Sequence, residues 1–175
     1  AVRRHGEQSQ VRELAQLLMT RDATHIMGVC QSAQEHQGLG VIVGQTGYGK
    51  TQTLKEVAQA DQVCYLECDD SFSPKDLVEA IEETLGLPRV TGTTWKRVSR
   101  IKEFFNYNPG YLLIIDEADK LITKYTQKKI EILRSIYDQS RMGMVIAGEP
   151  ALEGLIKGHL PRFANRVDFF VALKG

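Results

Sequence analysis

Residues 41–51 read VIVGQTGYGKT, a short apolar run that leads directly into a glycine-rich loop. Val41 to Val43 have the pattern of a buried strand, since short apolar runs bounded by glycine are typical of parallel-sheet cores. From Gly44 onward the spacing is Gly-x-x-x-x-Gly-Lys-Thr, which matches the phosphate-binding loop at every fixed position. A plain turn between strand and helix is the alternative, which the Lys-Thr pair in register disfavours. The stretch therefore predicts a nucleotide triphosphate site.

The chemistry of this loop assigns a task to each of its fixed residues. Successive N–H groups that face one anion require backbone conformations that a Cβ resists, which glycines supply. Lys50 then places a positive charge on the terminal phosphates, and Thr51 offers a hydroxyl to a Mg2+ ion that bridges them. A helix beginning near Lys50 directs its positive end at the same phosphates. The expected nucleotide contacts are Gly44, Gln45, Thr46, Gly47, Tyr48, Gly49, Lys50, Thr51 and Gln52.

A second motif follows about 65 residues later, where residues 112–119 read LLIIDEAD. Ligands of open parallel sheets bind at the carboxyl ends of the strands, so Asp116 is expected beside the Mg2+ of the loop. Glu117 is placed to polarise an attacking water as a general base. A small-molecule kinase has less need of the second acid, so the pair favours hydrolysis. A solvated strand-to-helix turn is the alternative, which the earlier loop disfavours.

The order of apolar and amphipathic segments predicts the fold. Strands alternate with helices, which implies right-handed crossovers and a five-stranded parallel sheet flanked by helices on both faces, an α/β arrangement of the P-loop NTPase type. Residues 1–36 are expected to form two helices that lead into a core of residues 37–175, together one domain. Strands are expected at 41–43, 62–67, 111–115, 142–147 and 167–171, and helices at 7–19, 23–36, 50–58, 73–86, 95–105, 127–139 and 150–157.

Composition limits the class of protein. The 175 residues are 42% hydrophobic and 25% charged, a globular composition with enough chain for one sizeable core. No apolar run is long enough to span a membrane, and the three cysteines have no metal-type spacing, so we expect a cytoplasmic protein with reduced thiols. The 22 basic and 22 acidic residues argue against a strongly basic nucleic-acid binder.

Charge is nevertheless unevenly distributed along the chain. Residues 67–83 hold acids and the single base Lys75, whereas residues 89–102 hold bases and no acid. The bases predict a positive edge next to a negative one. Trp95 lies among them, and core packing is favoured over stacking on a base for its ring.

Four motifs together resemble the AAA+ ATPases: GQTGYGKT, LLIIDEAD, MVIAGEP and LPRFANRV, in this order and at these intervals. The resemblance extends over residues 24–171 and is strongest to the transposition-helper branch, the phage Mu B protein and its transposon relatives. It implies binding of ATP or ADP with Mg2+, and hydrolysis of ATP. It further implies self-association into a ring or a helical filament on duplex DNA, without sequence preference, and delivery of target DNA to a transposase.

The resemblance also implies site residues. Lys50 and Glu117 are then catalytic, and Thr51 and Asp116 hold the metal. Arg166, with Arg162 as second choice, is the arginine that reaches a neighbouring subunit's nucleotide, an ordinary surface arginine pair being the alternative. The family's polar sensor position after the fourth strand holds Glu149, whose carboxylate would repel a γ-phosphate.

The DNA contacts that the resemblance implies lie in the helix before the acid pair. They are Lys96, Arg97, Arg100 and Lys102, with Lys120, Lys124, Lys128 and Lys129 as a weaker second set. A solvated helical face is the alternative for the first set. The helical lid that usually follows the AAA+ core is expected to be absent from this chain, which ends at Gly175.

Two other functions share the same core. An AAA+ replication initiator or clamp-type ATPase would normally add a lid and a DNA-binding domain. An AAA+ switch that acts on protein partners would make the basic helix irrelevant. Binding of duplex DNA, with and without ATP, separates these readings.

Overall fold

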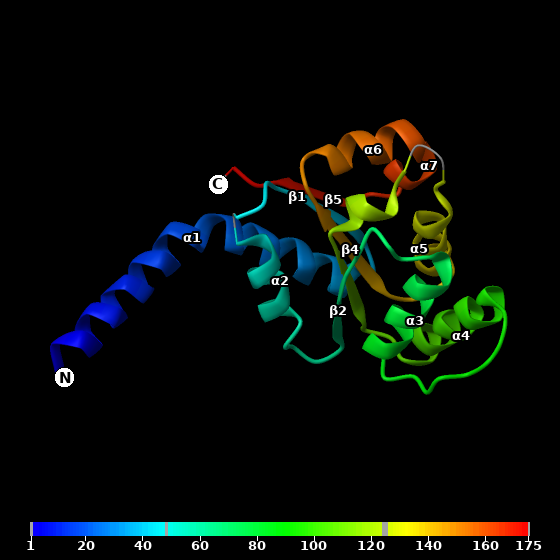
Figure 1. Ribbon diagram of the computed structural model, residues 1–175, viewed down its shortest axis with the longest axis horizontal. Coiled ribbons are helices and arrows are strands. Elements are labelled where there is room, and N and C mark those ends of the chain that lie inside the picture. Colours follow the sequence, from blue (N-terminus) through cyan, green and yellow to red (C-terminus); the bar gives the residue numbers. More distant parts are fainter. Residues whose placement is uncertain (1, 48, 124–125, 175) are drawn as a thin grey trace.

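In the computed structural model, the described residues form one parallel sheet between two layers of helices (Figure 1). The structure describes residues 2–47, 49–123 and 126–174, and only the backbone of residues 2–5, 7 and 11–20. Within these ranges the strands lie in the order β2-β3-β4-β1-β5, and every neighbouring pair is parallel. The strands are β1 Leu39–Val43, β2 Val63–Glu67, β3 Leu112–Asp116, β4 Gly143–Gly148 and β5 Phe169–Ala172. The predicted P-loop NTPase fold is therefore confirmed.

Two apolar layers hold the sheet, because alternate side chains of each strand point to opposite faces. In β3, Leu113 and Ile115 pack in the layer beneath α3, α4, α5 and α6, whereas Leu112 and Ile114 pack in the layer beneath α1 and α2. β3 is buried along its whole length. The helices are α1 Val2–His36, α2 Lys50–Val57, α3 Pro74–Thr84, α4 Thr94–Tyr107, η1 Ala118–Leu121, α5 Lys128–Asp138, α6 Ala151–His159 and α7 Pro161–Ala164.

Local signals in the sequence explain the helix boundaries. Ser73 caps α3 by accepting from the Asp76 amide, while the Asp76 carboxylate accepts from the Ser73 amide, as their spacing around Pro74 predicts. Thr93 caps α4 in the same way, accepting from the amide of Lys96. Each cap fixes where the helix begins.

The N-terminal segment differs from the prediction. The two expected helices are one helix, α1, whose first half extends away from the sheet (Figure 1). Neither glycine nor proline occurs between residues 19 and 23, so nothing in the sequence breaks the helix there. Residues 22–27 lie within this helix, and Ile26 is fully buried against the sheet, whereas Thr24, His25 and Met27 are exposed. The two short helices η1 and α7 were not predicted.

Within the described ranges, no helix combines the length and the apolar character needed to cross a bilayer. This agrees with the absence of a long apolar run in the sequence.

Candidate functional site

The glycine-rich loop joins β1 to α2 at the carboxyl edge of the sheet. Gly49 has a left-handed backbone with φ of 74°, and Gly47 has φ of 95°, so both need the freedom that a missing Cβ gives. Gly44 is required for close packing, whereas backbone freedom was expected to be its role. A Cβ there would meet Leu173 at 2.9 Å, so this glycine lets the chain after β5 pack closely. Tyr48, expected in the loop, lies outside the described residues.

Lys50 lies at the start of α2 with its ammonium directed into the edge of the sheet. Its Nζ donates to the carbonyl of Gly44 at 2.9 Å and to that of Gly148 at 2.8 Å. Gly148 is level with Val43 in the parallel pair of β1 and β4, so the lysine bridges the ends of two neighbouring strands. The residue as a whole is only 8% exposed. A buried point charge thus lies between the ends of β1 and β4, at the start of the glycine-rich loop.

Asp116 lies at the end of β3 and is fully buried. Its Oδ2 accepts a hydrogen bond from Thr51 Oγ1 at 2.7 Å, across 65 positions of sequence. Its Oδ1 accepts from the amide of Glu117 at 2.9 Å. The structure therefore brings the loop and the acid pair together at one edge of the sheet, as the sequence predicts.

This donor set fits a Mg2+ ion. Mg2+ prefers oxygen ligands, and the Thr51 hydroxyl keeps free lone pairs while its proton is donated to Asp116. The side chains of Thr51 and Asp116, together with oxygens of a bound triphosphate, would bind the ion. The observation that carries the fit is the 2.7 Å contact between the two oxygens.

Glu117 follows Asp116 in a left-handed backbone conformation with φ of 58°. Such a conformation is costly for a residue with a side chain and is common at functional sites. The Glu117 carboxylate pairs with Lys120 at 2.8 Å, both side chains being 33% exposed. The pKa of Lys120 is raised, chiefly by its hydrogen bond to Glu117. Glu117 is accordingly an accessible carboxylate beside a buried one.

Glu149, at the sensor position after β4, faces the loop. Its Oε1 accepts a hydrogen bond from Thr46 Oγ1 at 3.1 Å, and its amide donates to Asp119 Oδ1 at 3.3 Å. At the preceding residue, a Cβ on Gly148 would meet Asp119 Oδ1 at 2.3 Å, so only glycine allows this contact. A carboxylate thus lies against Thr46 of the phosphate-binding loop.

Tyr65 of β2 is a site residue that the sequence analysis missed. Its hydroxyl donates to Asp116 Oδ2 at 2.7 Å. The pKa of Tyr65 is raised, first by burial and then by the hydrogen bond to Asp116. A tyrosine within an apolar strand is normally read as core, and its position in β2 gave no other signal.

The prediction that the bases of helix α4 contact DNA needs correction, because several of them have partners within the protein. Arg97 is buried, 6% exposed, and its guanidinium pairs with Glu82 of α3 and, at 3.5 Å, with Glu79. Arg100 donates to the carbonyl of Pro88, and Lys102 donates to Ser135 and Gln139 of the α5 region. Arg97 is therefore an internal ion-pair partner and is not placed to contact DNA.

Other side chains of this region are open to solvent. Lys96 is exposed, and the neighbouring Trp95 is 73% exposed, so the expected core packing of Trp95 is wrong. Of the weaker set, Lys129 is buried and donates to the carbonyl of Phe72, Lys120 pairs with Glu117, and Lys124 lies outside the described residues. Lys96 is the exposed base of the first set.

Arg162 and Arg166 lie at α7 and just after it, and both are exposed. The Arg166 guanidinium is 3.7 Å from a carboxylate oxygen of Asp138, at the end of α5, and its side chain is 59% exposed. Neither arginine contacts the loop within its own chain among the interactions described. Both are available to another molecule.

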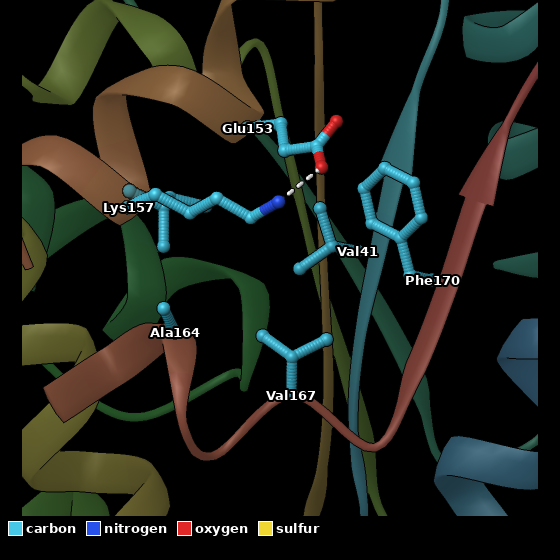
Figure 2. Close-up of a pocket in the computed structure, with 7 residues that line it drawn as sticks. Val41, Glu153, Lys157, Ala164, Val167 and Phe170 are labelled. Carbon is cyan, nitrogen blue, oxygen red and sulfur yellow. Dashed lines mark hydrogen bonds and ion pairs between the residues drawn. The ribbon is translucent and has the colours of Figure 1, made fainter. Parts of the chain in front are cut away.

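A separate pocket of about 250 Å3 lies between α6, α7 and the strands β1 and β5. Figure 2 shows Val41, Ala164, Val167 and Phe170 around it, with the ion pair of Glu153 and Lys157 on one side. It contains none of the residues of the phosphate loop or the acid pair. It is therefore distinct from the candidate nucleotide site.

Comparisons with known proteins agree with this geometry. A family described as an AAA domain matches residues 33–156, more than half of the chain. The Mu-like prophage FluMu DNA transposition protein B of Haemophilus influenzae is 27% identical over 158 residues, covering 85% of this chain and 52% of that protein. The ORC1-type DNA replication protein 2 of Thermoplasma acidophilum is 27% identical over 125 residues, covering 60% of this chain and 30% of that protein.

Solved structures are similar in fold. The Aeropyrum pernix ORC2 protein, in ADPNP-ADP complexes, superposes with a TM-score of 0.66 at 14% identity, covering 87% of this chain and 46% of that one. The Aeropyrum pernix ORC1 protein in complex with DNA gives 0.66 at 19% identity, covering 87% and 44%. The chain thus spans about half or less of the length of the proteins it matches.

Proposed function

Because the chain belongs to the AAA domain family, we propose that it binds and hydrolyses ATP, assembles on duplex DNA and assists the selection of transposition targets. Its resemblance to the transposition-helper branch of the AAA+ ATPases is confirmed by the match to a transposition protein B over most of the chain. An ATPase is the general activity that an AAA domain supports. The assembly, the DNA and the transposition step belong to the proposal.

One observation supports ATPase activity most directly: Thr51 and Asp116 are in contact at 2.7 Å, beside Lys50, at the carboxyl edge of the sheet. A turn between a strand and a helix would explain either motif alone. Their meeting at the edge where parallel sheets bind ligands supports a shared triphosphate and metal.

The chemistry follows from the positions of the side chains. Lys50 and the N-terminal end of α2 offset the negative charge of the terminal phosphates. Thr51 and Asp116 would hold a Mg2+ ion, which supplies further charge neutralisation when bound. Glu117 accepts a proton from water as its oxygen attacks the γ-phosphorus, and the bond to the β-γ bridging oxygen breaks to leave ADP and phosphate. Lys120 pairs with Oε2 of Glu117, which leaves Oε1 to accept the proton.

Assembly is proposed from the exposed arginines. Arg166 is 59% exposed, and Arg162 is exposed beside it, so either can enter a neighbouring subunit's site and offset transition-state charge. Mixing the Glu117→Gln variant with the Arg166→Ala variant tests this. Where an Arg166→Ala subunit holds the nucleotide and a Glu117→Gln subunit is the neighbour that supplies the arginine, the shared site has both an intact base and an intact arginine. Activity above that of either variant alone is expected. A mixture as inactive as its components would remove the arginine from the proposal.

DNA contact is proposed at the loop and first turn before the buried part of α4. Lys96 and Trp95 are exposed there, and Arg89 precedes them with a side chain 91% exposed and paired with Glu83. Such bases bind phosphate without reading sequence, and their binding weakens as salt rises.

The relative named as an ORC1-type DNA replication protein favours one second candidate, an AAA+ initiator. A titration of duplex DNA with and without ATP, at several salt concentrations and with DNAs of different sequence, separates the candidates. The transposition proposal expects ATP-dependent binding with a steep salt dependence and no sequence preference. A marked preference for one sequence would favour the initiator, and the absence of binding by an assembled sample would favour a switch for protein partners.

A further inference from the structure

The tyrosine of β2 stands out because its hydroxyl reaches the buried acid of the neighbouring strand. β2 pairs with β3 so that Tyr65 is level with Ile114 and Glu67 is level with Asp116. Tyr65 is thus level with the residue two positions before Asp116. Its side chain extends along the sheet towards the acid, and its hydroxyl oxygen lies 2.7 Å from Asp116 Oδ2. It belongs to neither of the sequence motifs that define the site.

The carboxylate it meets has no exposed surface. Water cannot then satisfy its oxygens, so the protein must supply donors. Thr51 and Tyr65 both donate to Oδ2, and the Glu117 amide donates to Oδ1. These contacts fix the plane of the carboxylate as well as its position.

We propose that Tyr65 is a positioning residue of the metal site, whose hydroxyl holds Asp116 so that Oδ2 stays against Thr51. The proposal rests on the proposed function, since it concerns the same Mg2+ site. The hydroxyl, not the ring, performs this task. The ring is packed against the apolar layer beneath α1 and α2, with the Lys55 ammonium 5.8 Å from its centroid, and these contacts do not involve the hydroxyl.

Groups that orient a metal ligand typically change metal affinity by about 10- to 100-fold when they are removed. Loss of the Tyr65 hydroxyl should therefore weaken Mg2+ and leave the metal-free contacts of the nucleotide with Lys50 and the loop unchanged. A loss of packing would instead weaken both. The two effects can be separated by measurement.

The test is Tyr65→Phe, which removes the hydroxyl and keeps the ring. Binding of a fluorescent ATP derivative is titrated first in EDTA and then against Mg2+ at fixed nucleotide. The expected result is an unchanged Kd in EDTA and a half-saturating Mg2+ concentration raised about tenfold. Tyr65→Met, which fills similar space without a donor, is the second variant and should give the same split. Thermal melting shows that each variant folds.

Two controls make the outcomes distinct. Tyr111→Phe removes a hydroxyl at the far end of β3, where the ring packs against Phe104 and Phe105, and should change neither titration. Thr51→Ala should raise the Mg2+ requirement. If Thr51→Ala does so and the Tyr65 variants do not, or if they weaken both titrations equally, the inference about Tyr65 is overturned and the proposed function stands. If Thr51→Ala changes nothing, the metal site itself is contradicted, and the inference with it.

Discussion

The carboxyl edge of the sheet and the helix pair α3 and α4 both gather charged side chains, but they use them differently. At the edge, Lys50 and Asp116 are buried with partners that come from separate strands and loops. Between the helices, Arg97 is buried in an ion pair with Glu82. The first arrangement collects charge around a place for a ligand, and the second neutralises charge within the protein.

The contrast explains why the acidic and basic runs of the sequence lie next to each other. The acids of α3 are the partners of the bases that follow: Glu82 pairs with Arg97 and lies 3.8 Å from Arg100, and Glu83 pairs with Arg89. A run of one sign therefore need not form a binding surface. A spacing motif is a better guide, because the backbone itself fixes where its side chains meet.

The largest expected effect is at the edge. Glu117→Gln removes the general base and keeps the size of the side chain, so ATP hydrolysis should fall by about 100- to 10,000-fold while ATP still binds. Phosphate release and nucleotide binding measure the two properties. Glu131→Gln on α5, whose carboxylate pairs with Arg134, is the matched control and should hydrolyse normally. Hydrolysis by Glu117→Gln at the native rate would show that the edge does not use this carboxylate as a base.

Between the helices the large effect should fall on stability. Arg97→Ala removes the hydrogen-bonded partner of the buried Glu82 and leaves only Arg100, 3.8 Å away, so the free energy of unfolding should fall by about 3–5 kcal/mol. Replacing both residues with apolar ones, Arg97→Met and Glu82→Leu, should recover most of this loss. Urea unfolding measures both. A loss below about 1 kcal/mol for Arg97→Ala would mean that the pair is not an internal one.

A smaller effect is expected at the mouth of the loop. The Glu149 carboxylate lies against Thr46 and should repel the phosphates, so Glu149→Gln should tighten ATP binding about fivefold, the equivalent of one screened charge contact of about 1 kcal/mol. ADP should gain less because it carries less charge. Glu153→Gln on α6, which loses only its pair with Lys157, is the control. Weaker ATP binding by Glu149→Gln would instead assign the carboxylate a supporting role.

The smallest effect is expected at the exposed end of α4. Lys96→Ala should weaken duplex binding uniformly across sequences and reduce the slope of log affinity against log salt by about 1. Lys157→Ala, an exposed lysine on α6, is the control with no expected change. If both lysines change the slope equally, the binding would reflect overall charge and not a surface at α4.

The comparison also shows what the sequence could predict. The loop, the acid pair and the five strands of the parallel sheet follow from apolar runs and fixed spacings, whereas the order of the strands in the sheet was not predicted. The hydrogen bond of Tyr65 to Asp116 and that of Thr46 to Glu149 join residues 51 and 103 positions apart, and no local pattern signals such contacts. Their prediction requires the register of the strands.

The burial of Arg97 had a signal that charge counting obscured. Arg97 lies four residues before the fully buried Ile101, so helical spacing places it on the inner stripe of α4. Acidic side chains of α3 neutralise its charge and so allow its burial. Trp95 shows the reverse, since an aromatic residue was expected inside but lies in the exposed first turn.

The central claim, that a lysine-bearing loop and an acid pair form one nucleotide site, is tested most directly by equilibrium binding of ATP with Mg2+ to the native chain and to Lys50→Ala. The native chain should bind saturably, and Lys50→Ala should bind about 100-fold more weakly, as expected for loss of a charged contact of about 3 kcal/mol. Equal affinity of the two proteins for ATP would contradict the account.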